Sequence, residues 1–338
     1  MERQEESRRS FLMFGHFQKG LLQPGGTGST RHSGEAMLRL RRQDGGSGAA
    51  GLELGGVSLG NRPWLVLGGG GLRGLAHIGA WRVLSAAGLR PAGIIGTSIG
   101  GLIGACIAAD RPLEEMEADA RNLRREDIAK LQRRAVWMKG IRAPALFRAE
   151  TLKRHLSRVL PDGDWGKLVI RFQTNALELG TGRTEWFGIG ARTDVSMVDA
   201  VYASAALPLF YPPISLPGGM YVDGGSEDAL PIGRAAELGA SVIIAIDVGG
   251  AERADPRAIV SQGMLAIHER VFGIMSGNRR RRSVQQWEGP PLLYIRPDVE
   301  RFGTLDFDHT EEILEMGRDA AERVLGGAPV SPRPGPAL

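Results

Sequence analysis

The sequence predicts an α/β fold, a three-layer α/β/α sandwich with a central, largely parallel sheet. From Trp64 onward, short apolar runs typical of buried strands alternate with longer segments that have helical periodicity. Such alternation is typical of a sheet with helices on both faces. The 338 residues, of which 42% are hydrophobic, can fill one large core. In this architecture, functional sites collect at the carboxyl ends of the strands.

The predicted elements follow from local patterning. The strands are short and bounded by turn residues, and we expect them at 64–67, 93–95, 168–174, 184–187, 220–222, 242–247 and 292–295. The helices are expected at 72–87, 99–109, 113–138, 149–159, 198–203, 232–238 and 310–325. We find no internal repeat of fixed period.

The ends of the chain have a different composition from its middle. Residues 1–62 are rich in Gly, Ser, Arg and Gln, which predicts a disordered arm, and the Pro-rich residues 328–338 predict a loose tail. Residues 63–327 are expected to form one domain. The arm's longest apolar run, 11–14, is too short for a signal-peptide core. With a single cysteine, Cys106, no intramolecular disulfide forms, so we expect a reducing, cytoplasmic location.

Charge gives little support to nucleic-acid binding. The 42 basic and 38 acidic side chains give a formal charge of +4 and are interspersed along the chain. Residues 92–109 contain no charge and have GxxxG spacing, which a hydropathy window would mark as a membrane span. A buried strand, a turn and a buried helix produce the same apolar run. We therefore expect no transmembrane segment.

A glycine loop follows the first predicted strand, in the segment LVLGGGGLRGLAHIGAW (65–81). Gly69, Gly71 and Gly74 satisfy GxGxxG, the pattern that holds a dinucleotide pyrophosphate. That fold requires Asp or Glu at the end of the second strand, where this sequence has Ser98. A phosphate-binding P-loop needs Lys-Ser or Lys-Thr after its last glycine, and none follows. The third alternative is an oxyanion hole.

The next strand end supports the oxyanion hole. The sequence GTSIG, from Gly96 to Gly100, reads GxSxG, the pattern of a nucleophile elbow. There the serine occupies a strained strand-to-helix turn, and the two glycines leave room for the crossing backbone. A serine at a helix start is also a common N-cap. The apolar strand before Ser98 and the apolar helix after it favour the nucleophile.

A nucleophilic serine needs a base, for which two kinds of residue compete. His309 follows Ser98 and Asp223 in the chain order of α/β-hydrolase triads, although its surroundings resemble a helix start. His77 is expected to pack the helix that follows the glycine loop. The carboxylate alternative is Asp223, which ends an apolar strand and is followed by Gly224 and Gly225. An Asp-Gly turn with no catalytic role gives the same pattern.

Taken together, these motifs resemble the patatin-like phospholipases, particularly the bacterial group related to the catalytic domain of neuropathy target esterase. GGGLRG (69–74), GTSIG (96–100) and DGG (223–225) occur in the order expected for that family. The segments ASAALPLFYPPI (203–214) and TNALELGTGRTEWF (174–187) also look like family segments. The resemblance covers 64–247 well and the remainder to 325 loosely.

The resemblance implies a patatin-like sandwich and a Ser-Asp dyad without histidine, in which Ser98 attacks and Asp223 is its base. Such an enzyme cleaves acyl esters of phospholipids or lysophospholipids through an acyl-enzyme and needs no cofactor and no metal. The expected oxyanion donors are the amides of Gly69, Gly70, Gly71 and Ile99. The supporting motif residues are Arg73, Gly74, Gly96, Gly100, Gly224 and Gly225.

Several alternatives stay open at this stage. Arg73 either anchors the oxyanion loop or an anionic head group, or it fixes its helix through a salt bridge. The predicted helix 113–138 and the cluster Arg279–Arg282 are either solvated or contact a membrane surface peripherally, at its inner face. A triad esterase using His309, a nucleotide-binding protein and a noncatalytic scaffold compete with the dyad hydrolase. The oligomeric state has no signal in the sequence.

Overall fold

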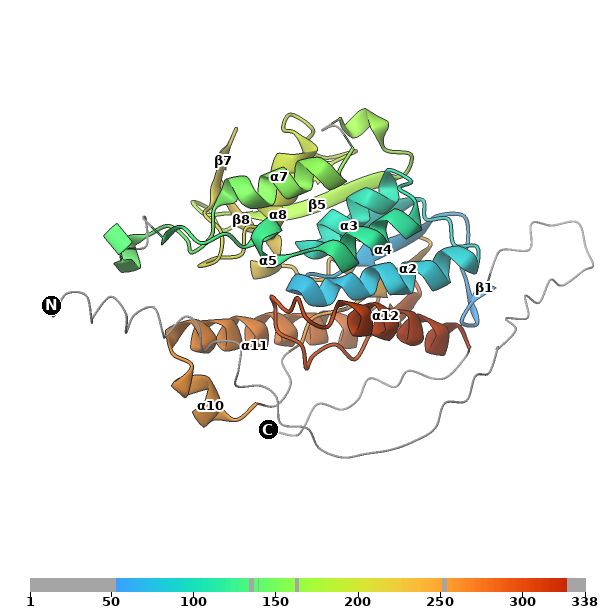
Figure 1. Cartoon of the computed structure of the whole chain (residues 1–338). Coiled ribbons are helices and arrows are strands. Elements are labelled where there is room, and N and C mark those ends of the chain that lie inside the picture. Colours follow the sequence, from blue (N-terminus) through green and yellow to red (C-terminus); the bar gives the residue numbers. More distant parts are fainter. Residues whose placement is uncertain (1–52, 134–136, 139, 162–163, 251–253, 327–338) are drawn as a thin grey trace, which may run out of the picture. The chain divides into compact units, whose positions relative to one another are not determined.

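A computed structural model describes residues 53–133, 137–138, 140–161, 164–250 and 254–326 (Figure 1). Residues 1–52 of the predicted arm and the predicted tail at 328–338 lie outside these ranges. The described residues from 53 to 250 and from 270 to 326 belong to one compact unit, and residues 254–269 belong to another. In the latter, α10 (Pro256–Ser261) begins after Asp255, whose side chain accepts a hydrogen bond from the Arg257 amide.

The larger unit is built on a mixed sheet that is mostly parallel, as the alternating pattern predicts. Strands β10, β9, β3, β4 and β5 are parallel neighbours, whereas β6, β7 and β8 join by antiparallel pairing. The sheet order is β10 (Leu292–Ile295), β9 (Val242–Ile246), β3 (Pro63–Leu67), β4 (Gly93–Gly96), β5 (Arg171–Glu178), β8 (Gly219–Asp223) and β7 (Ile214–Leu216), with β6 (Thr184–Gly188) also on β5.

The register around β5 brings two strand ends together. β6 pairs with residues 173–177 along one edge of β5. β4 pairs with 171–174 and β8 with 176–178, so both must use the opposite edge. β4 runs parallel to β5 and β8 antiparallel, so their carboxyl ends point at each other. Gly96 lies opposite Thr174 and Asp223 opposite Ala176, which are two residues apart on β5.

Two hydrophobic clusters lie on the two faces of the sheet, so the three-layer prediction is confirmed. Leu65 and Leu67 of β3 belong to the larger cluster, whereas Trp64 and Val66 belong to the smaller. Figure 1 shows α2 and α12 side by side, and they are in contact. The larger cluster includes side chains from α2 (Ala76–Ala86), α3 (Ile99–Ala108), α7 (Ala149–Val159), α8 (Met197–Ala205) and α12 (Thr310–Leu325), and the smaller from α9 (Ile232–Glu237).

The predicted helix 113–138 is wrong as a single element. It ends as α4 (Leu113–Asn122), and after extended backbone at Leu123 and Arg124 a separate turn, α5 (Arg125–Ile128), begins. The reason is local, because the Asp127 carboxylate accepts a hydrogen bond from the Arg124 amide (2.9 Å) and caps a new helix. Residues 134–136 of the expected helix lie outside the described residues.

Other elements differ from the prediction in extent. Residues 53–62, expected in the arm, include a two-stranded pairing of β1 (Glu53–Leu54) with β2 (Val57–Ser58), and Leu54 and Leu59 are buried. The expected helix at 72–87 starts as a 3₁₀ turn, η2 (Gly71–Leu75), that leads into α2. The helix α11 (Met264–Gln285) was not predicted. Two further 3₁₀ turns are η3 (Gly140–Arg142) and η4 (Trp165–Lys167).

The uncharged segment 92–109 is strand β4, the Ser98 turn and helix α3, as the sequence indicates. Most of its side chains are buried in the protein core. Within the described residues, no helix combines the length and the apolar character that crossing a bilayer requires.

Candidate active site

Ser98 lies in a strained turn between β4 and α3. Its backbone has φ 55° and ψ −122°, an unusual conformation for a residue other than glycine. The Ser98 amide donates to Oγ of Ser204, a fully buried residue of α8, at 2.8 Å. A Cβ on Gly96 would overlap the Gly100 carbonyl, and a Cβ on Gly100 would overlap the Leu67 carbonyl. The two glycines therefore permit the tight turn that exposes Ser98.

Asp223 ends β8 and is 3% exposed. The Gly225 amide donates to its Oδ1 (2.7 Å) in the 3₁₀ turn η5 (Gly224–Ser226). Burial raises the pKa of Asp223 to about 6, against the lowering effects of hydrogen bonds from the Ser98 side chain and the Gly225 amide. A Cβ on Gly224 would overlap the Asn175 carbonyl, so the turn can pack on β5 only with glycine there. The structure thus brings the Ser98 side chain close enough to the Asp223 carboxylate to lower its pKa.

The glycine loop runs past the elbow. A Cβ on Gly69 would lie 3.5 Å from Cβ of Ser98, so the two residues are neighbours. The Gly69 amide, expected among the oxyanion donors, instead donates to the Ala229 carbonyl (2.9 Å). Gly70 and Gly71 open η2, and Ile99 opens α3. In the part of the chain that the structure describes, no backbone carbonyl accepts a hydrogen bond from these three amides, as expected of first-turn donors.

Arg73 holds the glycine loop in place. Its Nε donates to the Gly70 carbonyl and its Nη1 to the Gly250 carbonyl, both at 2.9 Å. These are the contacts of a loop anchor, one of the two interpretations that the sequence leaves open. A Cβ on Gly74 would overlap the Ile99 side chain. Gly74 thus allows η2 to pack against the first residue of α3.

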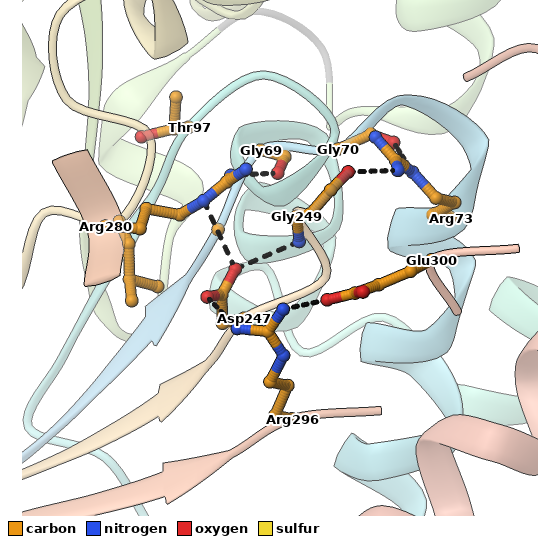
Figure 2. Close-up of polar contacts among 12 residues, drawn as sticks. Gly69, Gly70, Arg73, Thr97, Asp247, Gly249, Arg280, Arg296 and Glu300 are labelled. Carbon is orange, nitrogen blue, oxygen red and sulfur yellow. Dashed lines mark hydrogen bonds and ion pairs between the residues drawn. The ribbon is translucent and has the colours of Figure 1, made fainter. Parts of the chain in front are cut away.

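A buried ion pair lies against the same loop (Figure 2). Arg280 of α11, 6% exposed, donates from Nη1 to the Gly69 carbonyl at 3.0 Å. Its Nε lies 3.5 Å from Oδ1 of Asp247, which follows β9 and is 1% exposed. The sequence interpretation of Arg279–Arg282 as a solvated or head-group-binding cluster is therefore wrong for Arg280. Arg279 is exposed, and it donates to the Ser226 carbonyl and to the Glu227 carboxylate.

Sequence reasoning missed a buried polar cluster beside the elbow. Thr97 donates from Oγ1 to Oδ1 of Asn175 (2.9 Å), and both are fully buried. Asn175 donates from Nδ2 to the Asp228 carbonyl (2.9 Å). Burial raises the pKa of the Asp228 carboxyl to about 6. Thr97 follows β4 and Asn175 lies in β5, so this cluster fixes the elbow to the next strand of the sheet.

The histidines that competed for the base have other contacts. Nδ1 of His309, the residue before α12, lies 2.8 Å from Oδ1 of Asp306, and its ring packs against Phe302. His77 is fully buried and donates from Nε2 to the Gly68 carbonyl (2.8 Å). Burial lowers the pKa of His77 to about 4, so its ring is neutral. Its position under the glycine loop agrees with the packing role expected from the sequence.

Cys106 and the possible metal ligands complete the reactive groups of the described residues. Cys106 is buried in α3, and burial raises the pKa of its thiol to about 11, which makes it unreactive at neutral pH. Among the described residues, no three His, Cys, Asp or Glu side chains converge as a metal site would require.

Several known proteins are similar in sequence to this chain. Residues 65–236 match the family model described as patatin-like phospholipase. A protein named lysophospholipase NTE1, from Coccidioides immitis, is 30% identical over 294 residues, covering 79% of this chain and 18% of that protein. Patatin-like phospholipase domain-containing protein 6 of Homo sapiens is 28% identical over 294 residues, covering 80% of this chain and 21% of that protein.

The solved structures that match this chain are less similar to it in sequence. VipD from Legionella pneumophila has a TM-score of 0.44 and 13% sequence identity, covering 80% of this chain and 67% of that one. The chain spans about a fifth of the length of the curated relatives that it matches. The matched family region contains both Ser98 and Asp223.

Proposed function

This chain belongs to the patatin-like phospholipase family, and on that premise we propose that it hydrolyses acyl esters of lipids with Ser98 as nucleophile and Asp223 as general base. The observation that carries the proposal is that the Ser98 side chain interacts with the buried Asp223 carboxylate and lowers its pKa, while burial raises that pKa to about 6. Serine alone is a weak nucleophile and needs an adjacent group to take its proton.

Burial makes Asp223 a better base than an ordinary carboxylate. A pKa of about 6 leaves Asp223 mostly ionised at neutral pH while raising its proton affinity. Ser98 Oγ attacks the ester carbonyl carbon as its proton moves to Asp223. The tetrahedral intermediate then collapses, Asp223 returns the proton to the leaving alcohol, and the acyl group stays on Ser98. Water, deprotonated by Asp223, hydrolyses the acyl-enzyme and restores both residues.

The negative oxygen of the intermediate needs preorganised donors. The proposed donors are the amides of Gly70 and Gly71, at the start of η2, and of Ile99, at the start of α3. Each donor of this kind contributes roughly 3 kcal/mol to transition-state stabilisation. Gly69 has a different proposed role, because its missing side chain leaves space next to Ser98 while its amide bonds to Ala229.

The proposed substrate class is a phospholipid or lysophospholipid, which is consistent with relatives named lysophospholipase. Such a substrate is drawn from a lipid surface, so we expect peripheral contact with the inner face of a membrane. In α11, Val271, Ile274 and Met275 are 49%, 40% and 55% exposed, and exposed arginines follow at Arg281 and Arg282. Exposed apolar side chains next to cations suit contact with an anionic bilayer.

The test is hydrolysis by purified protein without added metal or cofactor. Wild type, Ser98→Ala and Asp223→Asn are compared on a chromogenic short-chain acyl ester, on a monomeric lysophospholipid and on the same lipid in anionic vesicles. We expect wild type to release fatty acid and both variants to be inactive but folded. Faster hydrolysis in vesicles would support surface contact. An inert wild type, or activity that survives in Ser98→Ala, would refute the proposal.

A further inference from the structure

Arg280 is a buried cation that takes part in no step of the proposed hydrolysis. It lies in α11, 211 residues from the glycine loop, yet its Nη1 donates to the Gly69 carbonyl oxygen at 3.0 Å (Figure 2). A buried arginine is costly unless it is paired and hydrogen-bonded. Arg280 meets that requirement through the loop carbonyl on one side and the Asp247 carboxylate on the other.

Asp247 is itself rigidly held. The Gly249 amide donates to its Oδ1 (2.9 Å), and the Tyr294 hydroxyl donates to its Oδ2 (2.7 Å). A second cation, Nη1 of Arg296, lies 3.8 Å from Oδ2. Asp247 is 1% exposed, so these contacts have little water to compete with them. The Asp247 carboxylate therefore holds the Arg280 guanidinium in one orientation.

The geometry of the peptide bond links Arg280 to the proposed oxyanion hole. In a planar trans peptide the carbonyl of one residue and the amide of the next point in opposite directions, and the described residues contain no cis peptide. Holding the Gly69 carbonyl against Arg280 therefore directs the Gly70 amide away from Arg280. Gly69 lies beside Ser98, and a Gly70 amide turned toward Ser98 would face the place where the ester carbonyl binds.

We propose that Arg280, oriented by Asp247, is a positioning residue that fixes the Gly69–Gly70 peptide so that the Gly70 amide faces the oxyanion. The proposal rests on the hydrolase function proposed above. Arg73 acts on the next peptide in the same way, since it holds the Gly70 carbonyl and so directs the Gly71 amide. Arg73 lies within the glycine motif, whereas Arg280 lies outside it and outside the matched family region.

The position of Gly249 provides a test that removes no charge. A Cβ there would overlap the Arg280 guanidinium, and Gly249 is not among the glycines with positive φ, so alanine is compatible with its backbone. Gly249→Ala should displace Arg280 from the Gly69 carbonyl. The matched control is Gly277→Ala in α11, where a Cβ would meet nothing within 4 Å.

A second variant separates positioning from stability. Arg280→Met alone leaves the buried Asp247 short of a partner, and such a variant can fail to fold. The double variant Asp247→Asn with Arg280→Met removes both charges, which limits that penalty, yet it still lacks the donor to Gly69. The double variant Asp319→Asn with Arg318→Met, which removes both charges of an exposed ion pair in α12, is its control.

Kinetics of ester hydrolysis and thermal unfolding are measured for all variants. Removing one oxyanion donor costs about 10²- to 10³-fold in kcat, so a misdirected donor should cost about 10- to 100-fold with KM within about 3-fold. We expect this loss in Gly249→Ala and in the double variant, both folded, and wild-type kcat in the two controls.

Two results would overturn the positioning role while leaving the hydrolase assignment intact. One is wild-type kcat in a folded Gly249→Ala or double variant, alongside an active wild type and an inactive Ser98→Ala. The other is a rise in KM with unchanged kcat, which would place Arg280 in substrate binding instead. An inert wild type would refute the hydrolase function itself.

Discussion

Replacing Asp223 with asparagine should abolish activity and at the same time stabilise the fold, by an amount that depends on pH. Burial raises the pKa of Asp223 from 3.8 to about 6. A group whose pKa is raised on folding stabilises the folded state fully below its unfolded pKa, and this contribution is lost as the pH rises through the folded pKa. The difference of about two pKa units corresponds to about 3 kcal/mol, at 1.36 kcal/mol each.

Asparagine has nearly the same shape and its amide oxygen can still accept the Gly225 hydrogen bond, but it does not titrate. The unfolding free energy of Asp223→Asn minus that of wild type should therefore be about 3 kcal/mol larger at pH 8 than at pH 3. At pH 5 this difference should have reached about half of that increase. Other titrating groups are common to both proteins and cancel. Urea unfolding followed by circular dichroism at pH 8, 6, 5, 4 and 3 measures the difference.

The activity of the same variant gives an independent readout. Loss of the general base should lower kcat by about 10²- to 10⁴-fold. In wild type, kcat/KM should fall as the pH drops through about 6, the pKa of Asp223, because the protonated carboxyl cannot accept the serine proton. A stability difference that is constant from pH 8 to pH 4 would refute the argument from burial, and a fully active Asp223→Asn would refute its role as base.

Three further predictions concern the turn at Ser98 and the alternative base His309. Ser98→Gly should be more stable to urea than Ser98→Ala by about 1 kcal/mol although both are inactive, since only glycine relieves the positive φ; equal stability would argue against backbone strain. Ser204→Ala should lower kcat roughly 10-fold because the Ser98 amide loses its acceptor, whereas the exposed Ser215→Ala should not; unchanged kcat in both would remove Ser204 from the support of the elbow. His309→Ala should keep kcat within about 3-fold of wild type, and a loss of about 100-fold or more would favour the histidine triad.

The catalytic candidates could be predicted because their signals are local. Ser98 follows a short apolar strand and lies between Gly96 and Gly100, whereas Asp223 ends such a strand and is followed by two glycines. How the two meet was not predictable from the pattern. It depends on β8 running antiparallel along the edge of β5 that β4 also uses, and periodicity identifies strands but not their partners.

Arg280 shows where sequence reasoning reaches its limit. Four consecutive arginines, 279–282, are typical of a solvated cluster in the sequence. One of them is buried because Asp247 and Gly249, more than thirty residues earlier, provide a carboxylate and an empty space for its guanidinium. Helix α11 was not predicted although Val271, Ile274 and Met275 have the i, i+3, i+4 spacing of one helix face, and in the structure these side chains are exposed.

The boundaries of helices depend on side-chain contacts that propensity does not reveal. The expected helix 113–138 stops after Asn122 because the Asp127 carboxylate caps a new turn. The Gly69 amide was expected to face the oxyanion, but the Ala229 carbonyl from a distant loop accepts its hydrogen bond. The first difference arises from a hydrogen bond between residues three apart, and the second from one between groups that are distant in the sequence.

The most direct test of the central claim is covalent labelling with a fluorophosphonate ester, which reacts with an activated serine and mimics the acylation step. Intact-mass measurement and peptide mapping would locate the adduct in wild type, Ser98→Ala and His309→Ala. We predict one adduct on Ser98 in wild type and in His309→Ala, and none in Ser98→Ala. An adduct on another residue, or no adduct in a folded wild type, would contradict the assignment of Ser98 as the nucleophile.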